Sequence, residues 1–173
     1  METYTANIEN LLAEALCYPG PEHLTFLEKG IEMITESPQK KFLVSFVEKI
    51  KPLSTGEWEE LYTRTLDLNP PAAPYVGFQT WGESYQRGTF LSKMNRTLLD
   101  AGIDLQGELP DHLIPVLRYL GQVSEPLPEL IEVLGPAVER ITAGLRKADP
   151  DNPYLELLEA VKSLYNALEK ESK

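Results

Sequence analysis

Three stretches decide how this chain is organised: WEELYTRTLDLNPP (residues 58–71), WGESYQRG (residues 81–88) and ELPDHL (residues 108–113). They are rich in aromatic residues, prolines and carboxylates. They interrupt a sequence whose apolar residues otherwise recur at helical spacing. None of them carries a phosphate-binding, metal-binding or nucleophile motif. The pattern indicates helices joined by loops that present a surface to another polypeptide.

Helical periodicity dominates the N-terminal half of the chain. Ile8, Leu11, Leu12, Ala15 and Leu16 follow the stripe of an amphipathic helix. Similar stripes predict helices over residues 22–34, 38–50, 54–65 and 84–101, with a short helix over residues 75–81. Ser37 before Pro38 predicts a helix start, and Ser54 with Glu57 predicts a capping box. Pro70, Pro71 and Pro74 exclude one regular helix between the first two stretches.

Prolines also punctuate the C-terminal part. A helix is predicted over residues 113–120, with Pro115 tolerated near its first turn. Ser124–Pro128 predicts the start of a short helix to Leu134. Gly135–Pro136 predicts a break, after which Val138–Leu145 continues on a new axis. Asn152–Pro153 predicts the start of the last helix, whose end at Glu169–Lys173 should fray.

No strand-like alternation of useful length accompanies these helices. The sequence therefore predicts one all-α domain over residues 1–173, a globular bundle of about eight or nine helices.

Composition narrows the class of protein. The chain has 173 residues, of which 42% are hydrophobic and 25% charged, which fits one packed domain. No apolar run approaches the roughly 18 residues that a membrane span needs. The start of the chain lacks the basic and apolar regions of a secretory signal, and Cys17 is the single cysteine. We expect a cytoplasmic protein.

The net charge points to the kind of partner. Asp and Glu outnumber Lys and Arg by 27 to 16, which gives a formal charge of −11. This balance disfavours nucleic acids and anionic membrane surfaces, which are bound mainly by Lys and Arg. It is compatible with a basic partner, and equally with acidity that only keeps the protein soluble.

Candidate catalytic groups are sparse. Gly82–Gly88 lacks the Gly-Lys-Ser/Thr ending of a phosphate loop, and His23 and His112 form no metal-ligand pair. Asp111–His112 is the polar pair that most resembles a catalytic acid–base pair, but adjacent residues on a helix rarely face each other. The favoured interpretation makes Asp111 a helix cap and His112 a rim residue. Cys17 is expected on the apolar face of the first helix.

Aromatic residues and carboxylates gather around the three stretches. Carboxylates beside aromatic rings form a good receptor for arginine, which pairs bidentately and stacks. About half of the rings are expected in the core. The rings are Trp58, Tyr62, Tyr75, Phe78, Trp81 and Tyr85, and the carboxylates are Asp67, Glu83, Glu108 and Asp111.

The same stretches resemble those of a known family. Leu61–Pro71 is similar to the "Y-x-x-x-F-D-L-N-P-P" segment of the NarJ family, residues 81–88 to its "F-G-D-S-x-x-R-G", and residues 108–113 to its "E-L-P-D-H/Y-L". NarJ-type proteins are assembly chaperones of respiratory nitrate reductase and related molybdoenzymes, within the TorD/DmsD/NarJ group. The resemblance covers about a third of the chain.

The resemblance implies an all-helical cytoplasmic chaperone and not an enzyme. Such a chaperone binds the N-terminal segment of a molybdoenzyme catalytic subunit, often a twin-arginine leader or its remnant. It holds the subunit until the molybdenum cofactor is inserted, binds no cofactor stably itself, and is absent from the final complex. Nitrate reductase is the default client by resemblance, and the chain would act as a monomer or homodimer.

The resemblance, together with the ring and carboxylate pattern, also implies a peptide-binding set. These residues are Trp58, Leu61, Tyr62, Asp67, Pro74, Tyr75, Trp81, Glu83, Glu108, Asp111 and His112. No catalytic or metal-binding residue is implied. Two alternatives remain open: a general helical adaptor for another basic partner, and a small-molecule enzyme that uses Asp111 and His112.

Overall fold

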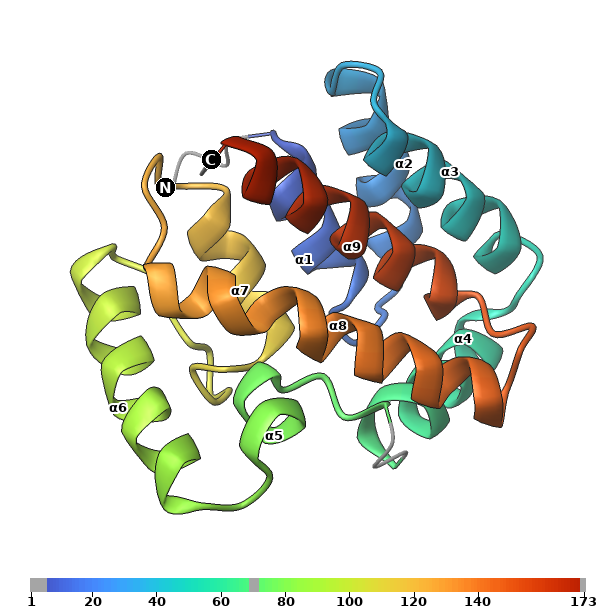
Figure 1. Ribbon diagram of the computed structural model, residues 1–173. Coiled ribbons are helices and arrows are strands. Elements are labelled where there is room, and N and C mark those ends of the chain that lie inside the picture. The colour runs from blue at the N-terminus through green and yellow to red at the C-terminus, as the bar shows by residue number, and fades with distance from the viewer. Residues whose placement is uncertain (1–5, 69–71, 172–173) are drawn as a thin grey trace.

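A computed structural model describes residues 6–68 and 72–171, so Asn69–Pro71 of the first stretch lies outside the described residues. The described chain folds into nine α-helices and one π-helical turn and contains no strand, which confirms the all-α prediction (Figure 1). The helices are α1 (Ile8–Ala15), α2 (His23–Met33), α3 (Pro38–Ile50), α4 (Thr55–Tyr62), α5 (Val76–Trp81), α6 (Tyr85–Asp100), α7 (Leu113–Leu120), α8 (Pro128–Ala148) and α9 (Tyr154–Glu171), and the π turn η1 (Thr63–Asp67) follows α4.

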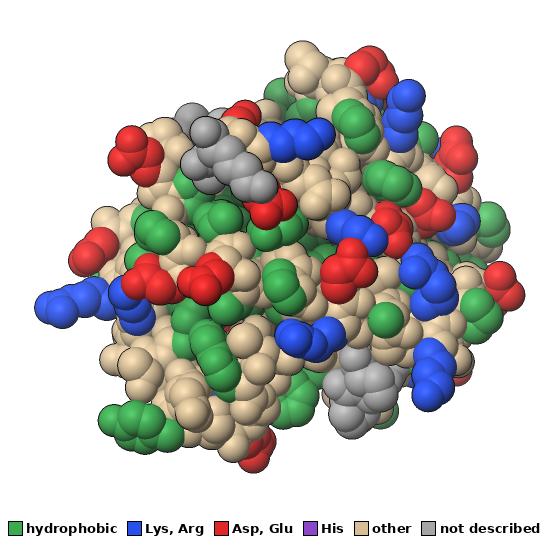
Figure 2. All heavy atoms as spheres, viewed as in Figure 1, with side chains coloured by type: hydrophobic (Ala, Val, Ile, Leu, Met, Phe, Trp, Pro, Cys, Tyr) green, Lys and Arg blue, Asp and Glu red, His purple; other side chains and the backbone are tan. Residues whose placement is uncertain are grey.

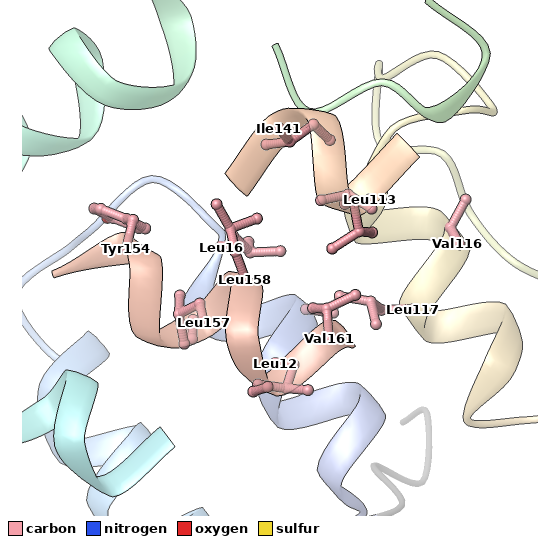
Figure 3. Packing of buried hydrophobic residues seen from close by; sticks show 14 of the residues in the cluster. Leu12, Leu16, Leu113, Val116, Leu117, Ile141, Tyr154, Leu157, Leu158 and Val161 are labelled. Carbon is pink, nitrogen blue, oxygen red and sulfur yellow. The ribbon is translucent and has the colours of Figure 1, made fainter. Parts of the chain in front are cut away.

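The last helix organises the core. α9 packs against α3 on one side and α8 on the other, while α1 packs on α7 and α5 on α8. Figure 3 shows side chains from three of these helices in the core, among them Leu12 of α1, Leu117 of α7 and Val161 of α9. Each is almost fully buried. Burial of a leucine or valine side chain contributes about 1.5–3 kcal/mol, so these apolar stripes hold the bundle together.

Predicted helix starts are confirmed where a side chain caps the backbone locally. Ser37 Oγ accepts a hydrogen bond from Lys40 N at 3.1 Å, with Pro38 in the first turn. Ser54 and Glu57 form the expected capping box. Asn152 Oδ1 accepts from Tyr154 N at 2.9 Å and starts α9. These contacts satisfy backbone N–H groups that have no partner inside the helix.

The predicted break at Gly135–Pro136 is wrong. α8 runs without interruption from Pro128 to Ala148. Pro136 is exposed, so the backbone hydrogen bond that its missing N–H removes lies on the solvent side. Gly135 is buried, and a Cβ there would lie 2.3 Å from Cε1 of Tyr165, so the glycine allows that ring to pack closely. The buried face of α8 continues past the proline.

The structure around the first and last helices differs in part from the sequence-based prediction. Cys17 does not lie on the apolar face of the first helix, because α1 ends at Ala15 and Leu16 is its C-cap. Cys17 is half-buried in the following turn, where its Sγ donates to Ala13 O at 3.4 Å. At the other end, α9 remains helical through Glu171. Within residues 6–68 and 72–171, no helix is both long and apolar enough to cross a membrane.

Candidate functional site

A short backbone bridge joins the segment between the first and second stretches to the third stretch. Tyr75 and His112 pair in antiparallel fashion. Val76 N donates to Asp111 O at 2.8 Å, and Leu113 N donates to Pro74 O at 2.9 Å. This bridge places the start of α7 beside the start of α5. Side chains that are far apart in sequence therefore meet there.

Asp111 is the centre of this junction. Its carboxylate is completely buried and accepts from Gly77 N at 3.0 Å, from Arg87 Nε at 3.1 Å and from Arg87 Nη2 at 3.3 Å. The guanidinium of Arg87 also lies over the rings of Tyr75 and Phe78, 5.7 and 5.5 Å from their centroids. A buried carboxylate needs such a partner, and Arg87 supplies it from α6.

The expected roles of Asp111 and His112 are therefore corrected. His112, not Asp111, caps α7: its Nδ1 accepts from Ile114 N at 3.0 Å, and the side chain is buried, not at the rim. Because Nδ1 accepts, the ring proton of neutral His112 lies on Nε2, which is 3.6 Å from Oε2 of Glu108. Asp111 binds Arg87 and does not orient His112, so the pair lacks the geometry of an acid–base couple.

Glu108 links the two rings of the bridge. The Tyr75 hydroxyl donates to Glu108 Oε1 at 3.1 Å, and the Tyr75 and His112 rings meet edge to face with centroids 5.0 Å apart. Burial and then the Glu108 carboxylate raise the pKa of Tyr75 to about 12. Burial lowers the pKa of His112, while Glu108, Asp111 and Asp67 act in the opposite direction. At neutral pH, Tyr75 is a neutral donor beside a carboxylate.

The first stretch joins this cluster through η1. Burial, and then the negative charge of Asp67, raises the pKa of Tyr62. The charge of Asp67 also acts on Tyr75 and His112, so the acidic residues of the first and third stretches share one environment. Tyr62 itself is buried, and its ring packs edge to face on Tyr18, with centroids 5.2 Å apart.

Three exposed apolar side chains adjoin these residues, two of them next to a carboxylate in the sequence and one against the Tyr62 ring. Tyr18 is 55% exposed, Leu68 75% and Leu109 44%. Leu68 directly follows Asp67, and Leu109 directly follows Glu108. We call the set formed by Tyr18, Asp67, Leu68, Tyr75, Glu108 and Leu109 the acidic–aromatic patch. Apolar contact area next to carboxylates suits a partner that is both apolar and basic.

Several predicted site residues lie outside this patch. Trp58 is buried, donates from Nε1 to the Tyr154 hydroxyl at 3.1 Å and stacks on His23. Leu61 and Pro74 are also buried and lie behind the surface. Trp81 packs on Phe90 of α6, and Glu83 is exposed in the turn between α5 and α6. Within the described part of the chain, neither Trp81 nor Glu83 forms a ring contact or hydrogen bond with the patch.

Sequence reasoning missed Tyr18, Arg87, Leu68 and Leu109. Arg87 is the single cation of the second stretch, which marks it as a partner for a nearby carboxylate. Tyr18 lies in the loop after α1, outside all three stretches. Leu68 and Leu109 are leucines inside polar loops, and this pattern could have marked them as exposed apolar residues of a binding surface.

Other features of the surface do not coincide with the patch. A hollow of about 600 Å³ lies between α3 and the α8–α9 turn, and none of the predicted site residues lines it. Figure 2 shows acidic and basic side chains intermingled on the face formed by α8 and α9. Ion pairs such as Lys49–Glu156 and Arg146–Glu159 account for part of that mixture. Among the residues that the structure describes, no group of three or more His, Cys, Asp and Glu could hold a metal ion.

Comparison with known families identifies the family of this chain. Residues 35–146 match the family described as "Nitrate reductase delta subunit". The match covers more than half of the chain, begins just before α3 and ends in α8, and includes all three stretches. No curated protein matches the chain.

Proposed function

The chain belongs to the nitrate reductase delta subunit family, a family of nitrate reductase assembly chaperones, and on this premise we propose what it binds. The proposed ligand is the N-terminal segment of a molybdoenzyme catalytic subunit. The chaperone holds that segment in the cytoplasm while the molybdenum cofactor is inserted. It then releases the subunit and takes no part in the final enzyme.

The observation that carries this proposal is the composition of the acidic–aromatic patch. Tyr18, Leu68 and Leu109 offer exposed apolar area, and Asp67 and Glu108 bring negative charge to the same surface. An amphipathic segment can lay its apolar side chains on such a surface while its arginines or lysines meet the carboxylates. A twin-arginine leader, or a basic remnant of one, has this chemistry.

The net charge of −11 supports the same ligand class. Opposite charge raises the rate of encounter between an acidic protein and a basic segment. The ion pairs formed at an exposed patch are individually weak, at roughly 0–1 kcal/mol each. Weak contacts favour release, which a chaperone that leaves its client requires.

The buried residues behind the patch supply rigidity. The Tyr62 ring packs against the Tyr18 ring. The hydrogen bond from the Tyr75 hydroxyl to Glu108 fixes the carboxylate that faces the ligand. Pre-ordered side chains reduce the entropy that binding must offset. In this proposal Trp58 and Leu61 contribute through the core and do not touch the peptide.

A calorimetric titration tests the proposal. The purified chain is titrated with a peptide copy of the N-terminal segment of a nitrate reductase catalytic subunit, at low and high salt. The control peptide carries glutamine in place of each arginine and lysine. We expect saturable binding that weakens as salt increases and is lost with the control peptide. Absence of binding by the folded chain, or equal binding of both peptides, would reject this ligand.

A further inference from the structure

The helix that leads into the patch changes its hydrogen-bond register at Thr63. Within α4 and at its end the backbone follows the ordinary pattern, since Thr63 N donates to Glu59 O and Glu60 O. Beyond that point Leu68 N donates to Thr63 O at 3.0 Å, a bond across five residues. Such π turns are rare and persist where surrounding contacts impose them.

A buried contact from the α8–α9 turn holds this π turn. Asn152 Nδ2 donates to Thr65 Oγ1 at 2.7 Å, and both side chains are at least 97% buried. The same amide group also donates to Asp149 Oδ2 at 3.2 Å, and Arg64 Nη1 donates to that oxygen at 3.1 Å. The first two residues after Thr63 are thus tied to the α8–α9 turn.

Thr65 differs from four other helical threonines in this protein. The hydroxyls of Thr80, Thr89, Thr97 and Thr142 each donate to the backbone carbonyl four residues earlier. That is the usual bond of a threonine within a helix. The Thr65 hydroxyl accepts a bond from Asn152 across 87 residues of sequence. Its contact is therefore tertiary and not part of the local helix.

The register of η1 decides where Asp67 and Leu68 lie. Each residue of an α-helix turns the chain by roughly 100°, and a π turn accommodates one additional residue. If residues 63–68 returned to the α register, the side chains after Thr65 would rotate around the helix axis by a large fraction of a turn. Asp67 and Leu68 would then leave the acidic–aromatic patch.

We propose that Thr65 and Asn152 are positioning residues for the peptide site, because their hydrogen bond maintains the π turn that presents Asp67 and Leu68. The inference rests on the proposed peptide-binding function. Neither residue touches the ligand. The α8–α9 turn, remote in sequence from all three stretches, is thereby a structural part of the site.

The variant Thr65→Val tests the inference, because it keeps the shape of the side chain and removes the acceptor. Asn152 retains its cap on Tyr154 N, so the start of α9 stays intact. We expect peptide affinity to fall about five- to tenfold and the thermal unfolding midpoint to fall by a few degrees, because one N–H of the buried Asn152 amide loses its acceptor. Thr65→Ser restores the acceptor and should restore affinity.

Two further measurements separate positioning from general destabilisation. Hydrogen exchange without peptide should show faster exchange at the Leu68 amide in Thr65→Val, because this amide closes the π turn. In a double-mutant cycle, Asp67→Asn should weaken binding in the wild-type background and have little further effect in Thr65→Val. Unchanged affinity in Thr65→Val, unchanged exchange at Leu68, or additive losses in the cycle would overturn the positioning role while peptide binding by the wild type stands. Failure of the wild type to bind any client peptide would overturn the proposed function and the positioning role together.

Discussion

Asp111 and Arg87, 24 residues apart in sequence, form an ion pair in which the carboxylate is fully buried and lies 3.1 Å from Nε of the arginine. The pair ties α6 to the start of α7, and the same carboxylate holds Gly77 N at the start of α5. It thereby fixes the bridge between Tyr75 and His112 on which the acidic–aromatic patch is built. The second and third stretches are one structural unit.

Asp111→Asn should destabilise the protein strongly. Arg87 would lose its anion while its side chain remains only 13% exposed. Removal of one partner from a buried pair costs about 3–5 kcal/mol, and the partial exposure of Arg87 places our expectation at the lower end of that range. Urea unfolding measures the change. Glu139→Gln, which removes the surface pair with Lys162, is the control and should leave the midpoint unchanged. A midpoint for Asp111→Asn equal to that of the control would contradict the structural role of the buried pair.

Two glycines near this junction should respond in opposite directions to alanine. A Cβ at Gly77 would lie 2.7 Å from Asp111 Oδ2, whereas a Cβ at Gly88 in α6 would meet nothing within 4 Å. Gly77→Ala should therefore cost about 1–3 kcal/mol through displacement of the fixed carboxylate. Gly88→Ala should stabilise by about 0.5–1 kcal/mol through helix propensity. The free energy of unfolding of each variant tests this prediction. A Gly77→Ala variant as stable as the wild type would mean that the Asp111 carboxylate is not held in place.

His23 should make stability depend on pH. Its Nε2 lies 2.6 Å from Glu14 O, and its buried Nδ1 has no hydrogen-bond partner within the described part of the chain. A charged imidazolium is disfavoured there, so burial lowers the pKa of His23 in the folded state. The unfolded state, with a pKa of about 6.5, then binds more protons as the solution is acidified. The contribution of His23 to the free energy of unfolding should be fully present above about pH 6.5. It should decrease as the pH falls below that value, until the pKa of the folded state is reached.

His23→Gln provides the test of this pH dependence, since glutamine can donate to Glu14 O but does not titrate. Denaturant unfolding at several pH values between 5 and 8 should give a flatter stability profile for the variant than for the wild type, with a difference of at most about 1.4 kcal/mol per pH unit. Identical profiles would assign the pH dependence to other groups, of which His112, whose pKa burial also lowers, is the first to examine.

Local chemistry explains which parts of the fold could be predicted. Ser37, Ser54 and Asn152 start helices through contacts within three residues, so a short window of sequence contains the cause. Pro136 misled the prediction because the effect of a proline depends on which side of the helix faces solvent. The roles of Asp111 and His112 were predicted wrongly because Arg87, the partner that binds Asp111 in place of the N-terminus of α7, comes from a different helix.

The candidate site was predicted in outline only. The sequence pattern identified the carboxylates Asp67 and Glu108 and the ring of Tyr75, which the structure brings into one environment. It could not separate buried rings from exposed ones, because the buried Trp58 and Tyr62 are four residues apart, the same spacing as Trp81 and the exposed Tyr85. The π turn after Tyr62 depends on Asn152, 87 residues beyond Thr65, and no local pattern encodes it.

Tyr18→Ala should weaken peptide binding by about 1–2 kcal/mol, because an exposed ring on the patch offers contact area that alanine lacks. Tyr62→Ala is a poorer test, since this buried ring packs against both Tyr18 and Tyr154 and its loss would disturb the fold. Met33→Ala is the matched surface control: Met33 is 72% exposed and is the last residue of α2, away from the patch. Calorimetry with the client peptide should show reduced affinity for Tyr18→Ala and wild-type affinity for Met33→Ala. If both variants bind as the wild type does, the ligand lies on another surface, and the acidic–aromatic patch would then need another explanation for its exposed side chains.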